Sequence, residues 1–226
     1  MRVNKRNYLV ALAVAVFMAC AAVGVAVASS ESGPPSRESY EAGSRTSLLA
    51  APTSAQTAVF AILGRAHDAA DTVPSEAAAQ VETSGSFKGL FGANINLAKK
   101  ARGFSSGVAW VVPGHDSICL VTGSEVNANG APQAGMPGGA TCDQETGVAK
   151  GQMYVVSGSR NAPGKQFIAG VVPNGVTQVT LELGGGAAPV VSPVHENVYM
   201  TMVSGSISSV SFDGPSGAVN LDHVGP

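Results

Sequence analysis

The chain has 226 residues, 28 glycines and a formal net charge of −2, and charged residues make up 12% of it. This length allows one or two domains, and many glycines with few charges favour a turn-rich β domain over a charged helical bundle. Arg2, Lys5 and Arg6 hold three positive charges near the N-terminus, so the remainder of the chain carries a net charge of −5. That sign, with no basic patch interleaved with aromatic residues, excludes nucleic acid as an expected partner.

The first 28 residues have the pattern of a membrane-targeting segment. A basic stub, residues 1–7, precedes residues 8–28, which contain no charged residue. A helix of this length spans about 30 Å, the thickness of the hydrocarbon core of a bilayer. Basic residues before the span predict that the stub stays in the cytoplasm and that the rest of the chain lies outside the plasma membrane.

Three fates of this segment are compatible with the sequence. It can stay in place as a single-pass signal anchor, or be cleaved after Ala26-Val27-Ala28, which forms an A-x-A site before Ser29. Cys20, within a poor lipobox, leaves lipoprotein processing as the third. The chain is exported in each case, and it is secreted if the segment is cleaved. Residues 29–51, rich in Ser, Gly, Pro, Glu and Arg, are predicted to form a flexible linker.

Residues 52–226 are predicted to form one extracytoplasmic α+β domain that begins with short helices. Thr53 and Gln56 have capping-box spacing, and apolar residues recur after them at helical period, so a helix is expected to run to about Thr72. A second short helix is expected at residues 75–81. Residues 96–102 are expected to form one or two helical turns, with their three basic side chains exposed to water.

From residue 108 onwards the sequence predicts β-strands in a mostly antiparallel sheet or sandwich. Residues 176–183 alternate, so that Val179 and Leu181 can face a core while the positions between them face water. Pro173-Asn174-Gly175 supplies turn chemistry before this strand. The other strands are expected at residues 108–112, 118–122, 153–156, 167–172 and 197–203, with a final hairpin at residues 206–222 around Asp213-Gly214-Pro215. Turns are expected at Pro113-Gly114 and residues 160–165, and a surface loop at residues 125–139.

Cys119 and Cys142 are the two cysteines outside the apolar segment, and in an exported chain they are expected to form a disulfide. It would close a loop of 24 residues and contribute about 3 kcal/mol in the chain-entropy model. Its expected role is to hold the loop at residues 125–139 against the sheet. Two unpaired thiols are the alternative. Zinc is disfavoured, because two cysteines without C-x-x-C spacing supply at most half a tetrahedral site.

Histidines near carboxylates are the candidates for chemistry. His67, Asp68 and Asp71 form the best cluster, since His67 and Asp71 lie one turn apart if the segment is helical. The remaining candidates are His115, Asp116, His195, Glu196 and His223. An exposed polar face accounts for the His67 cluster and a turn for His115 and Asp116, while His195-Glu196 and His223 have no partner visible in the sequence. No catalytic, metal-binding or cofactor-binding residue is therefore assigned.

Two local motifs of known catalytic and phosphate-binding sites are absent from the sequence. There is no H-E-x-x-H, and Gly184-Gly185-Gly186 lacks the Lys-Ser/Thr ending of a phosphate-binding loop. A Ser-His-Asp triad assembled from distant residues stays open, because triads form in space and not in sequence.

Four segments form a recognisable set: Leu63-Gly64-Arg65 through Ala70-Asp71 to Pro74, WVVPGHDSICLV, FIAGVVPNGVTQVTL and PVHENVY. In this order they resemble a group of uncharacterised exported proteins from actinobacteria. Those proteins typically have an N-terminal membrane segment, a VPG-x-x-x-(I/V)-C-L stretch, a later cysteine and a G-(L/V)-VP-(D/N)-GV segment. His195-Glu196-Asn197 stands where Asp before Asn is the commoner form. The resemblance covers roughly residues 61–203 and implies compartment and architecture, with no activity, ligand or catalytic residue.

These features favour a membrane-tethered extracytoplasmic module that binds an unknown protein or cell-envelope ligand. The alternatives are an exported hydrolase and a structural spacer. The hydrolase predicts a pocket that holds at least two of His67, Asp71, His115, Asp116, His195 and Glu196. The binding module predicts an apolar surface patch or an open groove.

Overall fold

The structure is a computed structural model that describes residues 48–75, 77–79, 91–105, 107–123, 138–158 and 163–224. The chain divides into two compact units, Met1–Ala42 and Gly43–Pro226, and every described residue belongs to the second. The predicted stub, the apolar segment 8–28 and most of the linker therefore lie outside the described residues. Among the residues that are described, none of the helices combines the length and the apolar character needed to cross a bilayer.

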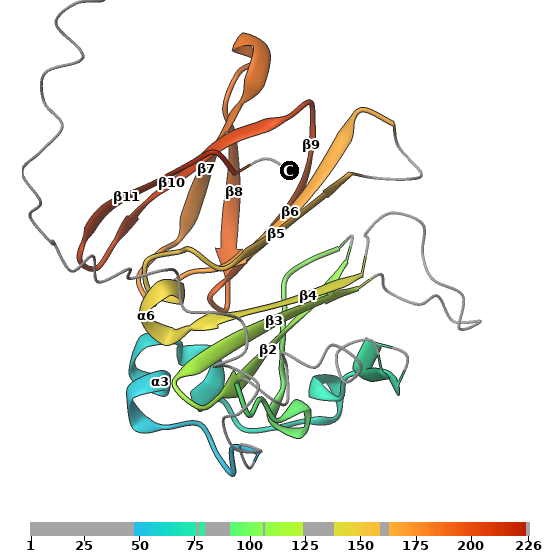
Figure 1. The fold of residues 1–226 in the computed structure, drawn as a ribbon, viewed down its shortest axis with the longest axis vertical. Coiled ribbons are helices and arrows are strands. Elements are labelled where there is room, and N and C mark those ends of the chain that lie inside the picture. Colours follow the sequence, from blue (N-terminus) through green and yellow to red (C-terminus); the bar gives the residue numbers. More distant parts are fainter. Residues whose placement is uncertain are drawn as a thin grey trace, which may run out of the picture. The chain divides into compact units, whose positions relative to one another are not determined.

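Two antiparallel sheets contain just under half of the described residues (Figure 1). The four-stranded sheet has the order β1-β2-β3-β4 and consists of β1 (Lys99–Ala101), β2 (Val108–Gly114), β3 (Ser117–Gly123) and β4 (Gly139–Gln144). The seven-stranded sheet has the order β11-β10-β7-β8-β9-β6-β5. Its strands are β5 (Tyr154–Gly158), β6 (Lys165–Val171), β7 (Gln178–Leu183), β8 (Val190–His195), β9 (Val198–Ser204), β10 (Ile207–Gly214) and β11 (Gly217–Asp222).

The helices are short. They are α3 (Ser54–Val59) and α6 (Glu145–Val148), with the 3-10 turns η1 (Ala61–Gly64), η2 (Ala69–Asp71), η3 (Ile95–Leu97) and η4 (Gly184–Gly186). Mostly antiparallel sheets with a few short helices confirm the predicted β-rich α+β class of the domain.

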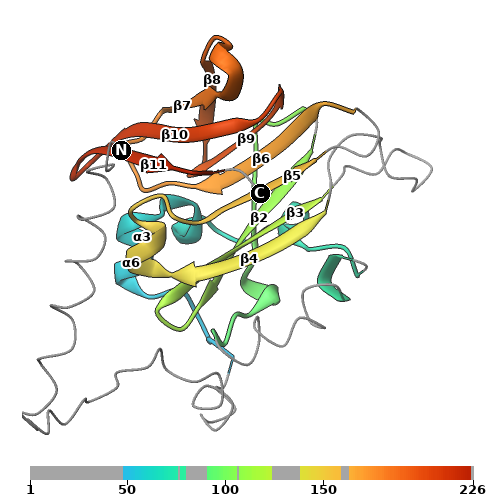
Figure 2. The same ribbon diagram turned by 45° about the horizontal axis from the view of Figure 1, so that its top comes forward.

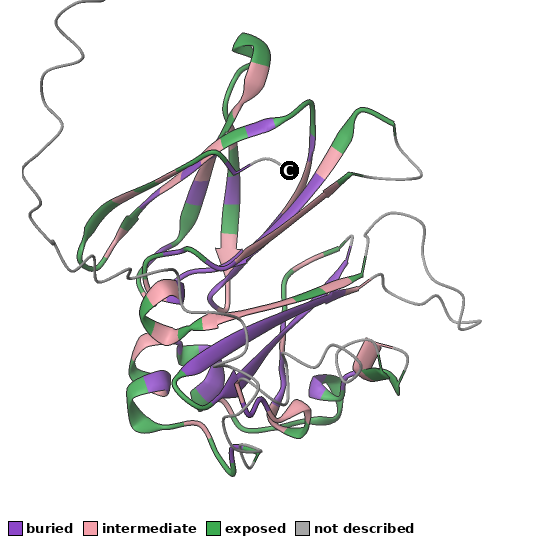
Figure 3. Ribbon diagram, in the orientation of Figure 1, coloured by how far each residue is buried: buried purple, intermediate pink, exposed green. Residues whose placement is uncertain are grey.

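Three apolar cores follow from the alternation of side chains along the strands. The first lies between the two sheets, where Val111 and Leu120 belong to the same buried cluster as Phe167 and Met200; Figures 1 and 2 show β5 and β6 beside β3 and β4. The second contains side chains from the other side of the larger sheet, and the third from the other side of the smaller one. β2 and β3 are consequently buried along nearly their whole length (Figure 3).

The predicted single helix up to Thr72 is wrong beyond its first turns. Thr53 and Gln56 form the expected capping box, but α3 ends at Val59, and Phe60 is buried in an extended conformation with φ −126°. The polypeptide then continues as η1, the four residues 65–68, and η2. Asn174 and Asn197, from loops of the larger sheet, accept hydrogen bonds from backbone N–H groups in η1. A continuous helix would bond these N–H groups to its own carbonyls.

Residues 96–102 also differ from the prediction. Only η3 is helical there, and β1 follows it and pairs with β2. Lys99 is buried, with 5% of its surface exposed, so the predicted exposed basic cluster is wrong for this residue. A strand replaces the helical turns because pairing with β2 and the carboxylate of Asp71 satisfy its backbone and its charge. In the second predicted helix, the described residues Ser75 and 77–79 are helical, and Val81 lies outside the described residues.

The predicted strands and hairpins agree with the structure within a few residues. β7 buries Val179 and Leu181 as expected, and β10 and β11 form the predicted hairpin with Gly214 opposite Gly217. Pro113-Gly114 is not a turn: both residues end β2, and the chain reverses at His115 and Asp116, where Asp116 has φ 48°. Most of the predicted loop 125–139 and part of the turn 160–165 lie outside the described residues.

The predicted disulfide joins Cys119 to Cys142. The two residues are directly opposite each other in the β3–β4 register, with their Cα atoms 4.0 Å apart. Cys119 is fully buried in the third core beside Val73 and Ala93. The bond therefore fastens two adjacent strands and fills a core position at the same time.

Candidate functional site

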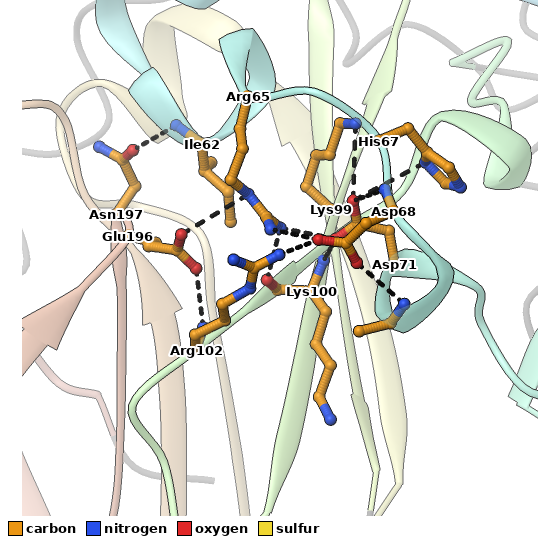
Figure 4. A network of polar contacts seen from close by, with 11 residues as sticks. Ile62, Arg65, His67, Asp68, Asp71, Lys99, Lys100, Arg102, Glu196 and Asn197 are labelled. Atoms are coloured by element: carbon orange, nitrogen blue, oxygen red, sulfur yellow. Dashed lines mark hydrogen bonds and ion pairs between the residues drawn. The ribbon is translucent and has the colours of Figure 1, made fainter.

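One network of charged side chains brings three distant parts of the chain together (Figure 4). The segment from η1 through η2 contributes Arg65, His67, Asp68 and Asp71; β1 and the residue after it contribute Lys99, the backbone of Lys100, and Arg102; the turn between β8 and β9 contributes Glu196. We call these residues the charged network.

Asp71 is the centre of the charged network, and its side chain is fully buried. Its Oδ1 accepts from Nη2 of Arg65 at 2.6 Å and from the backbone N–H of Lys100 at 2.9 Å. Its Oδ2 accepts from the backbone N–H of Asp68 at 3.0 Å and lies 3.6 Å from Nζ of Lys99. Asp68 in turn caps η2 through the N–H of Ala70. The carboxylate therefore compensates two cations and two backbone donors in one buried place.

These contacts decide the protonation of Asp71. Burial by itself raises the pKa of a carboxyl, but the N–H groups of Asp68 and Lys100 and the charges of Arg65 and Lys99 outweigh it. The pKa of Asp71 consequently lies below its ordinary value. Asp71 is an anion held in place by its partners, and not a proton donor near neutral pH.

Glu196 joins the charged network from a strained turn. His195 pairs with Val198, so Glu196 and Asn197 form a two-residue hairpin loop, and both have positive φ, 47° and 68°. Such a turn requires positive φ at both positions, which suits Asn but is unfavourable for Glu. The Glu196 Oε2 accepts from the N–H of Arg102 at 2.8 Å, and its Oε1 lies 3.6 Å from Nε of Arg65. Burial raises the pKa of Glu196, and the Arg65 charge opposes part of that rise.

Asn174 and Asn197 fasten the larger sheet to the break between α3 and η1. The Oδ1 of Asn174 accepts from the N–H of Ala61 at 2.8 Å, and the Oδ1 of Asn197 accepts from the N–H of Ile62 at 3.1 Å. The Nδ2 of Asn197 donates to Oδ1 of Asn174 at 2.9 Å and to the carbonyl of Val172 at 3.1 Å. We call these two residues the asparagine latch. Sequence reasoning missed it, although the turn signal at Asn174 marked one of its members.

Replacing Asn197 with glycine tests the asparagine latch. Glycine tolerates the positive φ, so the change removes the side-chain hydrogen bonds without adding backbone strain. We expect the free energy of unfolding to fall by about 2 kcal/mol, because the buried N–H of Ile62 loses its acceptor. Chemical denaturation measures this, with Asn96→Ala as the matched control at an exposed asparagine, expected to stay within about 0.5 kcal/mol. Equal effects of the two changes would contradict the latch.

The histidines of the predicted candidates have different environments. His67 is 47% exposed, and its Nδ1 lies 3.8 Å from Oδ2 of Asp71, so the predicted pairing exists although η2 replaces the expected helix. The ring of His195 packs edge-on against Phe104, with ring centroids 5.4 Å apart. A Cβ at Gly103 would lie 2.9 Å from Cγ of His195, so this imidazole packs directly on the backbone after β1.

The other candidates lie away from the charged network. His115 and Asp116 form the β2–β3 turn. The pKa of Glu145 is raised, mainly by burial of its carboxyl and to a smaller extent by the charge of Asp116. His223 follows β11. Within the described part of the chain, no group of three or more His, Cys, Asp or Glu side chains is arranged to hold a metal ion.

The charged network is balanced internally. Three carboxylates, those of Asp68, Asp71 and Glu196, face three cations, those of Arg65, Lys99 and Arg102. Each oxygen of Asp71 already accepts a hydrogen bond from this chain. This arrangement suits a structural clamp that joins the helical segment to both sheets.

Two hollows adjoin the described surface. One, of about 440 Å³, is lined by His67, Thr72, Val73, Ala78, Ile95 and Asn96, so among the described lining residues it holds one of the six residues that the hydrolase hypothesis named. The other is a groove of about 450 Å³ against β7, β10 and β11, which we call the β7–β11 groove. Its lining is Gly175, Thr177, Gln178, Thr180, Ser211, Phe212, Asp213, Ala218, Val219 and Asn220.

Comparisons with protein-family models, with curated proteins and with solved structures found no match for this chain. The residues and contacts of the chain itself are therefore the basis for its function.

Proposed function

We propose that the chain is a membrane-tethered extracytoplasmic module that binds a component of the cell envelope, with residues 8–28 as its tether. The observation that carries the proposal is the β7–β11 groove, an open polar hollow on a sheet whose other side packs into a buried core. A rigid scaffold with a preformed hollow is the usual setting of a binding site. The groove is also the kind of surface that the binding-module hypothesis requires.

Two further features support this proposal. The disulfide between Cys119 and Cys142 is of a kind that persists in oxidising compartments and is rare in the cytosol. The charged network, the best cluster of acids and imidazoles in the sequence, is engaged in contacts within the chain that hold the fold together. We also propose that the chain belongs with the exported actinobacterial proteins that it resembles.

Two measurements on cells that make the full chain test this function. Protease added outside intact spheroplasts is expected to digest a C-terminal tag; a protected tag would overturn the extracytoplasmic placement. A photo-crosslinking residue at Asn220, in the β7–β11 groove, is expected to capture an envelope component, while the same residue at Asp116, in the exposed β2–β3 turn, is not. Equal capture at both positions, or none at Asn220, would overturn the groove as the binding surface.

An exported hydrolase is the second candidate, on one specific observation. His67 lines the 440 Å³ hollow, and its Nδ1 lies 3.8 Å from Oδ2 of the buried Asp71 carboxylate, a histidine–carboxylate pairing of the kind that orients a general base. Under this hypothesis His67→Gln abolishes hydrolysis of an ester probe and changes the free energy of unfolding by less than about 1 kcal/mol, because His67 is 47% exposed and meets Asp71 only at 3.8 Å. Retained hydrolysis in that variant, or no hydrolysis by the unaltered chain, would exclude it.

A further inference from the structure

The β7–β11 groove lies where two strands of the larger sheet separate. β7 and β10 pair only from Thr180 opposite Ser211 to Leu183 opposite Ile207. Both strands continue beyond that pairing, β7 back to Gln178 and β10 on to Gly214. Figure 1 shows the β10–β11 hairpin running away from β7 and β8 at this end. The groove is lined by the start of β7 on one side and by the end of β10 on the other.

The strand registers show pairing on one edge only at the separated ends of β7 and β10. Gln178 and Val179 pair with β8, and Phe212 and Asp213 pair with β11. At these residues, each of β7 and β10 is therefore paired along one of its two edges. The opposite edges face the place where β7 and β10 have separated. Along such an edge, alternate residues present N–H and C=O groups that a further strand can bond. The groove thus has the backbone pattern that accepts an extended peptide.

The side chains that line the groove leave room for an extended peptide. Most are small or short and polar, with hydroxyls at Thr177, Thr180 and Ser211. Phe212 is the one large side chain of the lining and is only 6% exposed. A Cβ at Gly151 would lie 2.5 Å from the Phe212 ring, so this ring packs directly against the backbone of Gly151 beneath the groove.

The carboxylates in and near the groove indicate the charge of the peptide that binds there. Lys165 is the last Lys or Arg of the sequence, and the 61 residues after it contain four carboxylates. Glu196 is engaged by Arg65 and Arg102, whereas Glu182, Asp213 and Asp222 are exposed. Asp213 lines the groove itself. This charge asymmetry favours a positively charged partner.

We propose that the β7–β11 groove binds an extended peptide segment carrying Lys or Arg, which adds as a strand between the separated ends of β7 and β10. Main-chain hydrogen bonds to Gln178–Val179 and Phe212–Asp213 hold the segment, and the carboxylate of Asp213 pairs with one of its cations. This mode of recognition takes affinity from backbone pairing and specificity from alternate side chains. The inference rests on the proposed binding function and names the chemistry of the partner.

Binding of synthetic peptides to the purified full chain, followed by fluorescence anisotropy, tests the inference. The probe is a labelled octapeptide of alternating Thr and Lys, and two control peptides replace Lys with Glu or methylate alternate backbone nitrogens. The Lys peptide is expected to bind, the Glu peptide not to bind, and the methylated peptide to lose at least tenfold in affinity, because it cannot complete the strand pairing. Methylated and unmethylated peptides that bind equally would overturn strand addition.

Matched acid variants locate the site. Asp213→Asn is expected to weaken binding of the Lys peptide by about three- to fivefold and to reduce its salt dependence, as for one solvent-exposed ion pair. Asp116→Asn, an exposed carboxylate in the β2–β3 turn, is expected to leave binding unchanged. Equal effects of the two variants, or no effect of Asp213→Asn, would overturn the assignment to the groove. Capture of an envelope component at Asn220, with no peptide bound, would reject this inference and leave the proposed function standing.

Discussion

Replacing Asp71 with asparagine is expected to lower the free energy of unfolding by about 3–5 kcal/mol, the cost of breaking a buried ion pair by removing one partner. Asparagine fills the same volume but carries no charge, so Lys99 stays in place without the carboxylate beside it, while Arg65 keeps its contacts with Asp68 and Glu196. Lys99 is only 6% exposed, so water has little access to its charge. In Asp71, each of the backbone N–H groups of Asp68 and Lys100 donates to its own carboxylate oxygen. Asparagine offers these two donors a single amide oxygen.

Asp68→Asn is the matched control for this prediction. Asp68 is 45% exposed and pairs with Arg65 and Arg102 near the solvent, where an ion pair contributes about 1 kcal/mol at most. Its other role, capping η2 through the N–H of Ala70, is one that asparagine performs as well as aspartate. Urea denaturation of the two variants at about pH 7 should therefore separate a buried anion from an exposed one. If both changes cost the same, the charged network contributes no more than a surface ion pair.

The same pair of proteins gives a pH dependence with a defined sign. The pKa of Asp71 is depressed below its ordinary value of 3.8 in the folded chain. Its contribution is therefore complete above about pH 4 and is lost as the pH falls through the depressed value. The stability gap between the original chain and Asp71→Asn should narrow over that range. Glu196 acts in the opposite sense, since its pKa is raised, and the charge of Asp71 contributes to that rise. Its effect therefore differs between the two proteins, but it falls at higher pH than the depressed range of Asp71. A gap that does not narrow at any pH below the ordinary value of 3.8 would contradict this assignment.

Local signals in the sequence were sufficient for most of the sheet. β7 follows from strict alternation after a Pro-Asn-Gly turn, and the β10–β11 hairpin follows from apolar runs on both sides of Asp213-Gly214-Pro215. Both depend on neighbouring residues, because alternation and turn chemistry act over a few positions. The Cys119–Cys142 disulfide was predictable for a simpler reason: the chain offers only one pair of cysteines beyond the apolar segment.

Long-range contacts explain what the sequence did not reveal. The apolar period after Thr53 is helical, yet α3 stops at Val59 because Asn174 and Asn197 bond the N–H groups of Ala61 and Ile62 from 113 and 135 residues away. Lys99 looked like part of an exposed cluster because nothing near it in sequence indicates a buried anion.

The charged network was visible only in part. The spacing of His67 and Asp71 indicated one contact, which the structure keeps through η2. Glu196 enters from a hairpin turn 94 residues beyond Arg102, and no local pattern marks that pairing. The one indication that Glu196 is unusual is its positive φ. That angle can be expected only once the β8–β9 turn is known to have two residues.

Removing the disulfide with the double change Cys119→Ala and Cys142→Ala is expected to lower the free energy of unfolding by about 3 kcal/mol in the chain-entropy model. For a chain of this size, that corresponds to a fall of about 6–12 °C in Tm. The reason is mainly in the unfolded chain, where the bond closes the loop between β3 and β4. Calorimetry of both proteins with and without dithiothreitol measures the effect.

The reductant separates the covalent bond from the apolar contacts of the two side chains. Cys119 is fully buried in the third core, so alanine at this position also leaves unfilled space and adds its own cost. Reduction of the original chain breaks the bond and keeps both sulfur atoms, so its Tm should fall by less than that of the double variant, whose Tm should not respond to dithiothreitol. The difference between these two values gives the packing contribution of the sulfur atoms. If reduction leaves the Tm of the original chain unchanged, the bond adds nothing to a register that β3 and β4 already hold by backbone pairing, and its expected entropic role is wrong.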